Sequence, residues 1–108
     1  MTLLVLVGCA SLVHPGAAHL AWAQARQPTV ELRDLEEGRE VYVRECGNCH
    51  GLRLPRQHAP EEWAGFVTQM IREEDVVLTA EDEARVVLFL EAAATVTDDE
   101  IKAAEGAP

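Results

Sequence analysis

Two cysteines and a histidine stand together near the middle of the chain, as Cys46-Gly47-Asn48-Cys49-His50. Thiols and imidazoles of this kind bind metals or carry out redox chemistry. Two thiols separated by two residues also match the spacing of the two vinyl groups on one edge of a porphyrin, with which they form thioethers. The adjacent histidine then lies under the iron. The C-x-x-C-H spacing therefore predicts one covalently attached haem c, held by Cys46 and Cys49, with His50 as an axial iron ligand.

Three other uses of this motif fit the sequence less well. A structural zinc site needs a fourth ligand and normally a second pair of ligands, but the only other histidine after the apolar leader is His58. A thioredoxin-type redox pair belongs to a βαβ unit, and the sequence predicts helices. A disulfide between the two cysteines gives His50 no role.

The residues that lead into the motif predict an amphipathic helix over 29–46, entered after Pro28. Its apolar positions Leu35, Val41 and Tyr42 stand on a charged background. This helix runs directly into the cysteines, so its packing positions them.

Two more helices are expected after the motif. Residues 51–60 hold a glycine and two prolines without helical periodicity and predict a loop. A second helix over 60–74 begins at Pro60, a favourable first residue, and continues with two acids that the helix dipole favours. A third helix extends to about residue 94, with Thr79 as its N-cap.

The chain resembles the small class I cytochromes c beyond the haem motif itself. In that family a glycine eight residues and an aromatic residue four residues before the first cysteine let the N-terminal helix cross the C-terminal helix closely. Gly38 and Tyr42 occupy those positions, and Val86, Phe89 and Leu90 match the pattern of the family's last helix. The resemblance implies an all-α fold, a small cytochrome c-like domain of about three helices wrapped around one haem c.

The resemblance also implies a methionine on the side of the iron opposite the histidine. Met70 is the only methionine after the leader. Trp63, Val67 and Met70 stand at positions i, i+4 and i+7, so the three residues share one face of the expected helix. This W-x-x-x-V-x-x-M arrangement resembles compact haem domains that serve as subunits of oxidoreductases. The alternatives are Met70 as a core filler, His58 as the distal ligand, and an open iron site.

Several neighbouring residues are candidates for supporting contacts with the haem. Family members use a proline carbonyl to accept the Nδ1 proton of the axial histidine; Pro60 fits by spacing and Pro55 is the alternative. Arg53 and Arg56 could pair with the haem propionates, and Trp63 could line the haem edge. Each of these residues also has a purely structural explanation. The prolines could stiffen the loop, the arginines could be solvated, and the tryptophan could belong to the core.

Residues 1–25 predict a secretory signal peptide. An apolar run over 3–13 is short for a membrane span, and small residues follow it, with cleavage expected after Ala23 or Ala25. The alternative is a lipoprotein, since Leu6-Val7-Gly8-Cys9 resembles a bacterial lipobox whose cysteine becomes acylated. An N-terminal helix of the folded domain fits less well, because no charged residue precedes Arg26 to give it a polar face.

The remaining chain is strongly acidic. Its formal net charge is −10, which makes nucleic acid an unfavourable partner. Residues 29–95 are expected to form the cytochrome c domain, and residues 96–108 an acidic flexible tail. A domain of this size gains from a bound cofactor, because a core of so few residues gives marginal stability.

These features together predict one-electron transfer rather than enzyme catalysis, with a redox protein as the partner and no small-molecule substrate. The protein is expected in the periplasm or another exported location, as a soluble carrier or as the cytochrome subunit of an oxidoreductase. It would be attached to a membrane only if Cys9 is lipidated. The alternative function is a five-coordinate haem enzyme or a sensor of peroxide or a gas.

Overall fold

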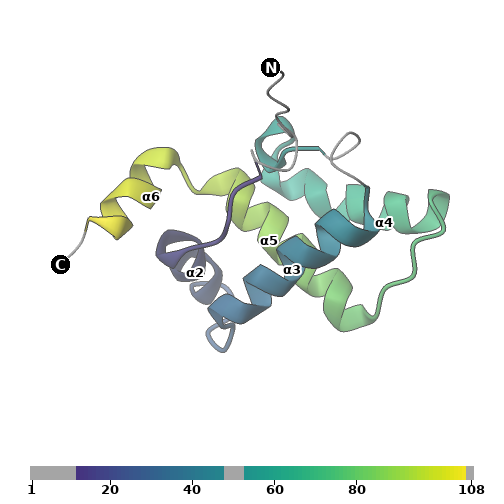
Figure 1. Ribbon diagram of the computed structural model, residues 1–108, viewed down its shortest axis with the longest axis horizontal. Coiled ribbons are helices and arrows are strands. Elements are labelled where there is room, and N and C mark those ends of the chain that lie inside the picture. The colour runs from purple at the N-terminus through teal and green to yellow at the C-terminus, as the bar shows by residue number, and fades with distance from the viewer. Residues whose placement is uncertain (1–11, 48–52, 107–108) are drawn as a thin grey trace, which may run out of the picture.

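The computed structural model describes residues 12–47 and 53–106, and this part of the chain folds as α-helices without strands. The α-helices are α2 (Ala17–Gln24), α3 (Leu32–Glu45), α4 (Trp63–Glu73), α5 (Ala80–Thr95) and α6 (Asp98–Glu105). Two 3-10 helices, η1 (Pro55–Gln57) and η2 (Pro60–Glu62), lie between α3 and α4 (Figure 1). The all-α class is therefore as expected.

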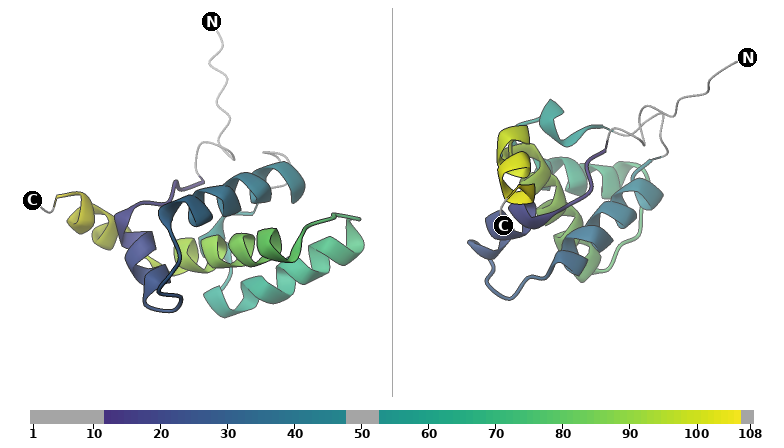
Figure 2. Two further views of the ribbon diagram at one scale, coloured as in Figure 1. Left: turned by 90° about the horizontal axis from the view of Figure 1, so that it is seen from below. Right: turned by 60° about the vertical axis from the view of Figure 1, so that its left-hand side comes forward.

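Helices α3 and α5 cross at the centre of the molecule (Figures 1 and 2). Gly38 lies at the crossing, where a Cβ atom would overlap the carbonyl oxygen of Arg85 and come within 3.1 Å of the Phe89 Cβ. The close approach of these two helices was expected at Gly38. A glycine is needed here because any side chain would push the helices apart.

The core between the helices consists of apolar side chains from every central element. Its buried members include Tyr42 of α3, Trp63 and Val67 of α4, and Val86 and Phe89 of α5. Trp63 and Val67 are both fully buried, so the apolar face predicted for this helix is the face that packs. Further buried members of the same cluster are Leu12, Val41, Leu90 and Ala93.

The predicted starts of two helices are present. Pro60 begins η2, which continues into α4. Thr79 caps α5, and its hydroxyl oxygen accepts the backbone N–H of Asp82 at 3.0 Å. Helix α3 begins at Leu32, three residues later than expected, after Glu31 as N-cap.

Two further helices form where no domain element was expected. Helix α2 lies within the predicted leader and packs against α6, α5 and α3, although its removal as a signal peptide stays a prediction. Helix α6 lies within the predicted flexible tail. It forms because Thr97 and Glu100 make a capping box: the Thr97 Oγ1 accepts the Glu100 N–H, and the Glu100 carboxylate accepts the Thr97 N–H.

Within the described residues, no helix is both long enough and apolar enough to span a membrane.

Candidate functional site

The first cysteine of the motif lies just beyond the C-terminal end of α3. Cys46 is half-buried and packs against the central core, and its backbone N–H donates to the carbonyl oxygen of Tyr42 at 3.0 Å. Gly47 has a φ of 146°, a conformation that side-chain-bearing residues rarely adopt. A glycine is therefore favoured directly after Cys46. Cys49 and His50 lie outside the described residues.

The hydroxyl of Tyr42 ties the segment after the motif back to α3. It donates to the backbone carbonyl oxygen of Arg53 at 2.7 Å. The Tyr42 side chain is almost fully buried, and burial raises the pKa of its hydroxyl far above the ordinary value. This hydrogen bond fixes the return point of the chain that carries the motif, three residues beyond His50.

Trp63 fixes the same segment from the other side. Its indole Nε1 donates to the backbone carbonyl oxygen of Pro55 at 2.8 Å, and the bond is buried. The Trp63 ring meets the Tyr42 ring edge-on, with 6.1 Å between centroids. Residues 53 and 55 are therefore each anchored by an aromatic side chain of the core.

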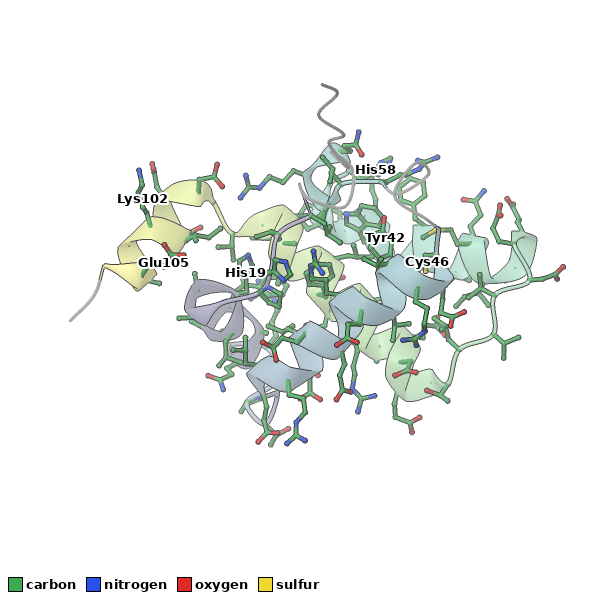
Figure 3. The ribbon with its side chains drawn as sticks, in the orientation of Figure 1. His19, Tyr42, Cys46, His58, Lys102 and Glu105 are labelled. Carbon is green, nitrogen blue, oxygen red and sulfur yellow. The ribbon has the colours of Figure 1, made fainter. Side chains whose placement is uncertain are left out.

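His58 lies against two aromatic rings. Its ring centroid is 5.2 Å from that of Trp63 and 4.2 Å from that of Phe66. The His58 Nε2 is 3.0 Å from Nη1 of Arg53, and its Nδ1 is 4.0 Å from the carboxylate of Glu62. In the view of Figure 3, Tyr42, Cys46 and His58 lie on the side of the molecule away from α6.

A hollow of about 220 Å³ opens beside these aromatic rings. Its wall includes Arg53, Trp63, Phe66 and Met70. Met70 is half-buried and packs against the same core cluster as Cys46. Met70, the predicted distal ligand, and Cys46, the first cysteine of the motif, therefore pack against the same core cluster. The remaining wall residues are Gln69, Glu73 and Glu74.

The two arginines expected near the cofactor separate in the structure. Arg53 stays at the hollow, with its guanidinium carbon 5.8 Å from the centre of the Phe66 ring. Arg56 reaches instead to the junction of α5 and α6, where its Nη2 donates to the carbonyl oxygen of Val96 at 2.8 Å and pairs with Asp98 at 3.0 Å. Arg53 is consequently the better placed of the two for a ligand in the hollow.

Trp63 already donates a hydrogen bond to each of the two candidate proline carbonyls. Pro55 accepts from the indole of Trp63, and Pro60 accepts from the backbone N–H of the same residue. Each carbonyl oxygen retains a second lone pair. Which of them receives the Nδ1 proton of His50 stays a prediction, because His50 lies outside the described residues.

The Cys46 thiol sits in a poor environment for ionisation. Burial, helped by the negative charge of Glu45, raises the pKa of this thiol to about 11. A free Cys46 is therefore protonated at neutral pH and is a weak nucleophile.

Phe66 was not among the residues expected at the site. It lies one helical turn after Trp63, and its ring contacts His58 and lies 5.9 Å from that of Trp63. The i+3 spacing from Trp63 was the available signal, since residues three apart share a helix face. Among residues 12–47 and 53–106, no group of three or more His, Cys, Asp or Glu side chains gathers as a metal site.

Comparison with known proteins gives no match. No protein-family model fits the chain, and no curated protein sequence or solved structure is significantly similar to it.

Proposed function

We propose that the chain carries one haem c, bound through Cys46 and Cys49 with His50 as an axial ligand, and that it transfers single electrons to and from a redox protein outside the cytoplasm. The observation that carries this proposal is the C-x-x-C-H motif itself. When bound, haem c supplies a one-electron couple between ferrous and ferric iron.

The position of Cys46 supports the proposal. The crossing at Gly38 sets how α3 lies on α5, and α3 delivers Cys46 to the edge of the central core. A cofactor attached at this point would start beside apolar side chains rather than in bulk water. The raised pKa of the half-buried Cys46 thiol, beside its place at the core, argues against a dithiol redox function.

Three residues at the wall of the hollow support the proposal. Trp63 and Phe66 offer aromatic surface that excludes water from an apolar ligand. The Arg53 guanidinium lies at the same hollow and is suited to pair with a carboxylate such as a propionate. The wall of the hollow therefore combines two aromatic rings and one cation with the polar residues Gln69, Glu73 and Glu74.

We favour Met70 over His58 as the second axial ligand. Met70 lines the hollow, whereas His58 packs edge-on against Trp63 and has Arg53 and Glu62 beside its ring nitrogens. Moving His58 to an iron atom would break these contacts. A methionine ligand also raises the reduction potential relative to a second histidine, which suits an electron carrier.

Covalent haem attachment is tested by expressing the full chain with a cytochrome c maturation system. We expect wild type to give a haemochrome spectrum and to keep its haem in denaturant. The variants Cys46→Ala and Cys49→Ala should each lose at least one thioether, and His50→Ala should lose the low-spin spectrum. Asn48→Ser keeps the cysteine spacing and is the matched control. A wild-type protein without a haemochrome spectrum would refute the proposal.

The second ligand is tested with Met70→Ala and His58→Ala, using Gln69→Ala on the same helix as a control. We expect only Met70→Ala to convert the ferric protein from low spin to high spin and to make the ferrous protein bind carbon monoxide rapidly. Rapid carbon monoxide binding by wild type would instead favour the five-coordinate enzyme or sensor.

A further inference from the structure

Leu12 lies inside the central core, although it belongs to the predicted leader. Its side chain is 1% exposed and joins the cluster that contains Tyr42, Trp63 and Phe89. Those three residues come from α3, α4 and α5. Leu12 therefore contributes to the core that these helices share.

Arg39 of α3 holds the backbone at the same place. Its Nε donates to the carbonyl oxygen of Val13 and its Nη2 to that of Leu12, both at 3.0 Å, across 26 and 27 residues of sequence. The donors of a guanidinium are fixed in one plane, so two bonds from one arginine set the direction of the chain as well as its position.

The same stretch lies beside the segment that follows the cysteine motif. Residues 12–14 and 54–56 line one hollow of about 450 Å³, together with Ala93 and Asp98. The start of the described chain thus adjoins the segment that Tyr42 and Trp63 anchor.

Helix α2 is also packed into the domain. It contacts α6, α5 and α3, and Figure 2 shows it against the end of α5, next to α6. Ala23 of this helix is fully buried in a second core cluster with Val30, Leu35 and Leu88. The Gln24 side chain donates to the carbonyl oxygen of Val30 at 3.1 Å. The helix therefore joins the domain through apolar and polar contacts.

His19 marks the buried side of α2. Its side chain is 1% exposed, and its Nδ1 accepts the backbone N–H of Gly16 at 3.1 Å at the start of the helix. Burial, together with the charge of Arg56, lowers the pKa of the imidazole, so the ring is neutral in neutral solution. A neutral imidazole is the form that a protein interior accepts.

The two expected cleavage points fall at this packed region. The carbonyl oxygen of Ala23 accepts the backbone N–H groups of Arg26 at 3.0 Å and Gln27 at 2.9 Å, so the chain closes a turn across both points. A cut after Ala23 or Ala25 would remove Leu12 from one core cluster and Ala23 from the other.

Such a cut would uncover what the segment covers. Apolar side chains of both clusters would meet water, and the Arg39 guanidinium would lose both of its carbonyl partners. Burial of apolar surface is the main stabilising contribution to a fold, and a small domain has little stability in reserve. A segment that is discarded on export has no need of contacts this extensive with the domain it leaves.

We propose that Leu12–Gln24 is retained in the mature protein as a strap that completes both core clusters. Any cleavage on export then falls before Leu12, and not after Ala23 or Ala25. Retention of this strap is independent of the haem.

The direct test is the N-terminus of the mature protein. The full chain is produced with a C-terminal purification tag in cells that export it, and the intact mass and N-terminal sequence of the purified protein are measured. We expect a chain that begins at Leu12 or earlier. A mature chain that begins after Leu12, at Gln24 or Arg26 for example, overturns the proposal.

A second test uses a residue outside the leader, so that the export signal stays unchanged. Arg39→Met removes both bonds to the strap, and we expect it to lower the melting temperature of the exported protein by roughly 5 °C. Arg33→Met removes an exposed arginine of the same helix, whose ion pair with Glu31 lies in solvent, and should leave the melting temperature unchanged. Equal melting temperatures for the two variants would overturn the proposal.

Leu12→Ala tests the core contact of the strap. The variant opens a cavity between the helices, so the melting temperature should fall by roughly 5 °C or more. His14→Ala, at an exposed position two residues away, is the control and should match wild type. A Leu12→Ala protein as stable as wild type would show that the strap is absent from the core. The haemochrome spectrum of the same samples reports separately on the proposed function.

Discussion

At the scale of single residues, two aromatic side chains fix the segment that follows the cysteine motif. Tyr42 donates to the carbonyl oxygen of Arg53, and Trp63 donates to that of Pro55. Both donors are buried, where an unpaired polar group is costly. The chain is therefore held by hydrogen bonds from the core at residues 53 and 55, shortly after Cys49 and His50 in the sequence.

Tyr42→Phe tests this role of the tyrosine hydroxyl. The variant keeps the ring but leaves the Arg53 carbonyl without its partner, so we expect a loss of about 1–2 kcal/mol in the free energy of unfolding. Urea denaturation measures it. Thr68→Ala removes an exposed hydroxyl that donates to the Ala64 carbonyl within α4, and it should change stability by less than about 0.5 kcal/mol. An equal effect of the two variants would show that the Tyr42 hydroxyl is not an anchor.

At the scale of helices, the contact between α3 and α5 depends on one missing side chain. Gly38 lies where a Cβ would overlap the backbone of Arg85. Gly65, in the first turn of α4, has nothing within 4 Å of the place where its Cβ would be. The two glycines therefore occupy helices for different reasons, and the same substitution should affect them in opposite directions.

Gly38→Ala is expected to destabilise the protein by about 1–3 kcal/mol, because the backbone of α5 cannot yield as a flexible side chain would. Gly65→Ala should stabilise it by about 0.5–1 kcal/mol, since alanine favours the helix and meets no neighbour. Chemical denaturation of both variants, read by circular dichroism, measures the difference. Two changes of the same sign would contradict the close crossing.

At the scale of the whole molecule, an ion pair between α3 and α5 makes the stability of the fold depend on pH. Asp34 of α3 accepts the backbone N–H of Glu31 at 2.8 Å and the Nε of Arg85 of α5 at 3.3 Å. The bond from Glu31 and the pairing with Arg85 lower the pKa of Asp34 below its usual value of 3.8. A carboxyl with a lowered pKa stabilises the fold above its ordinary pKa and loses this contribution as the pH falls.

Asp34→Ala should therefore be less stable than wild type at neutral pH by about 1 kcal/mol, a modest value because the ion pair is partly solvated. The difference should shrink as the pH falls below about 4, where Asp34 of the unfolded chain takes up a proton, and should level off once the pH is below the lowered pKa of the folded carboxyl. Unfolding free energies measured across this range give the comparison. Glu36→Ala, an exposed carboxylate on the same helix, is the control, and a difference independent of pH would show that the charge of Asp34 contributes nothing.

Much of this protein could be predicted from local sequence. The Cys46-Gly47-Asn48-Cys49-His50 spacing predicts a cofactor through chemistry contained in five neighbouring residues. The helix starts at Pro60 and Thr79 also depend on contacts within one turn, so reading them needs no knowledge of the fold. The glycine at the helix crossing was expected from the resemblance to the class I cytochromes c, whose pattern includes Gly38 and Tyr42.

Tertiary structure decided how the long-range partners are arranged. Arg53 and Arg56 are close in sequence, yet one faces the hollow and the other pairs with Asp98. Helix α2 lacks the charged face that marks a surface helix in the sequence, and its order comes from burial against α5 and α6. The sequence alone therefore predicts the chemistry of neighbouring residues such as Cys46, Cys49 and His50. The fold decides which distant groups come together, because packing depends on contacts between residues that lie far apart in the chain.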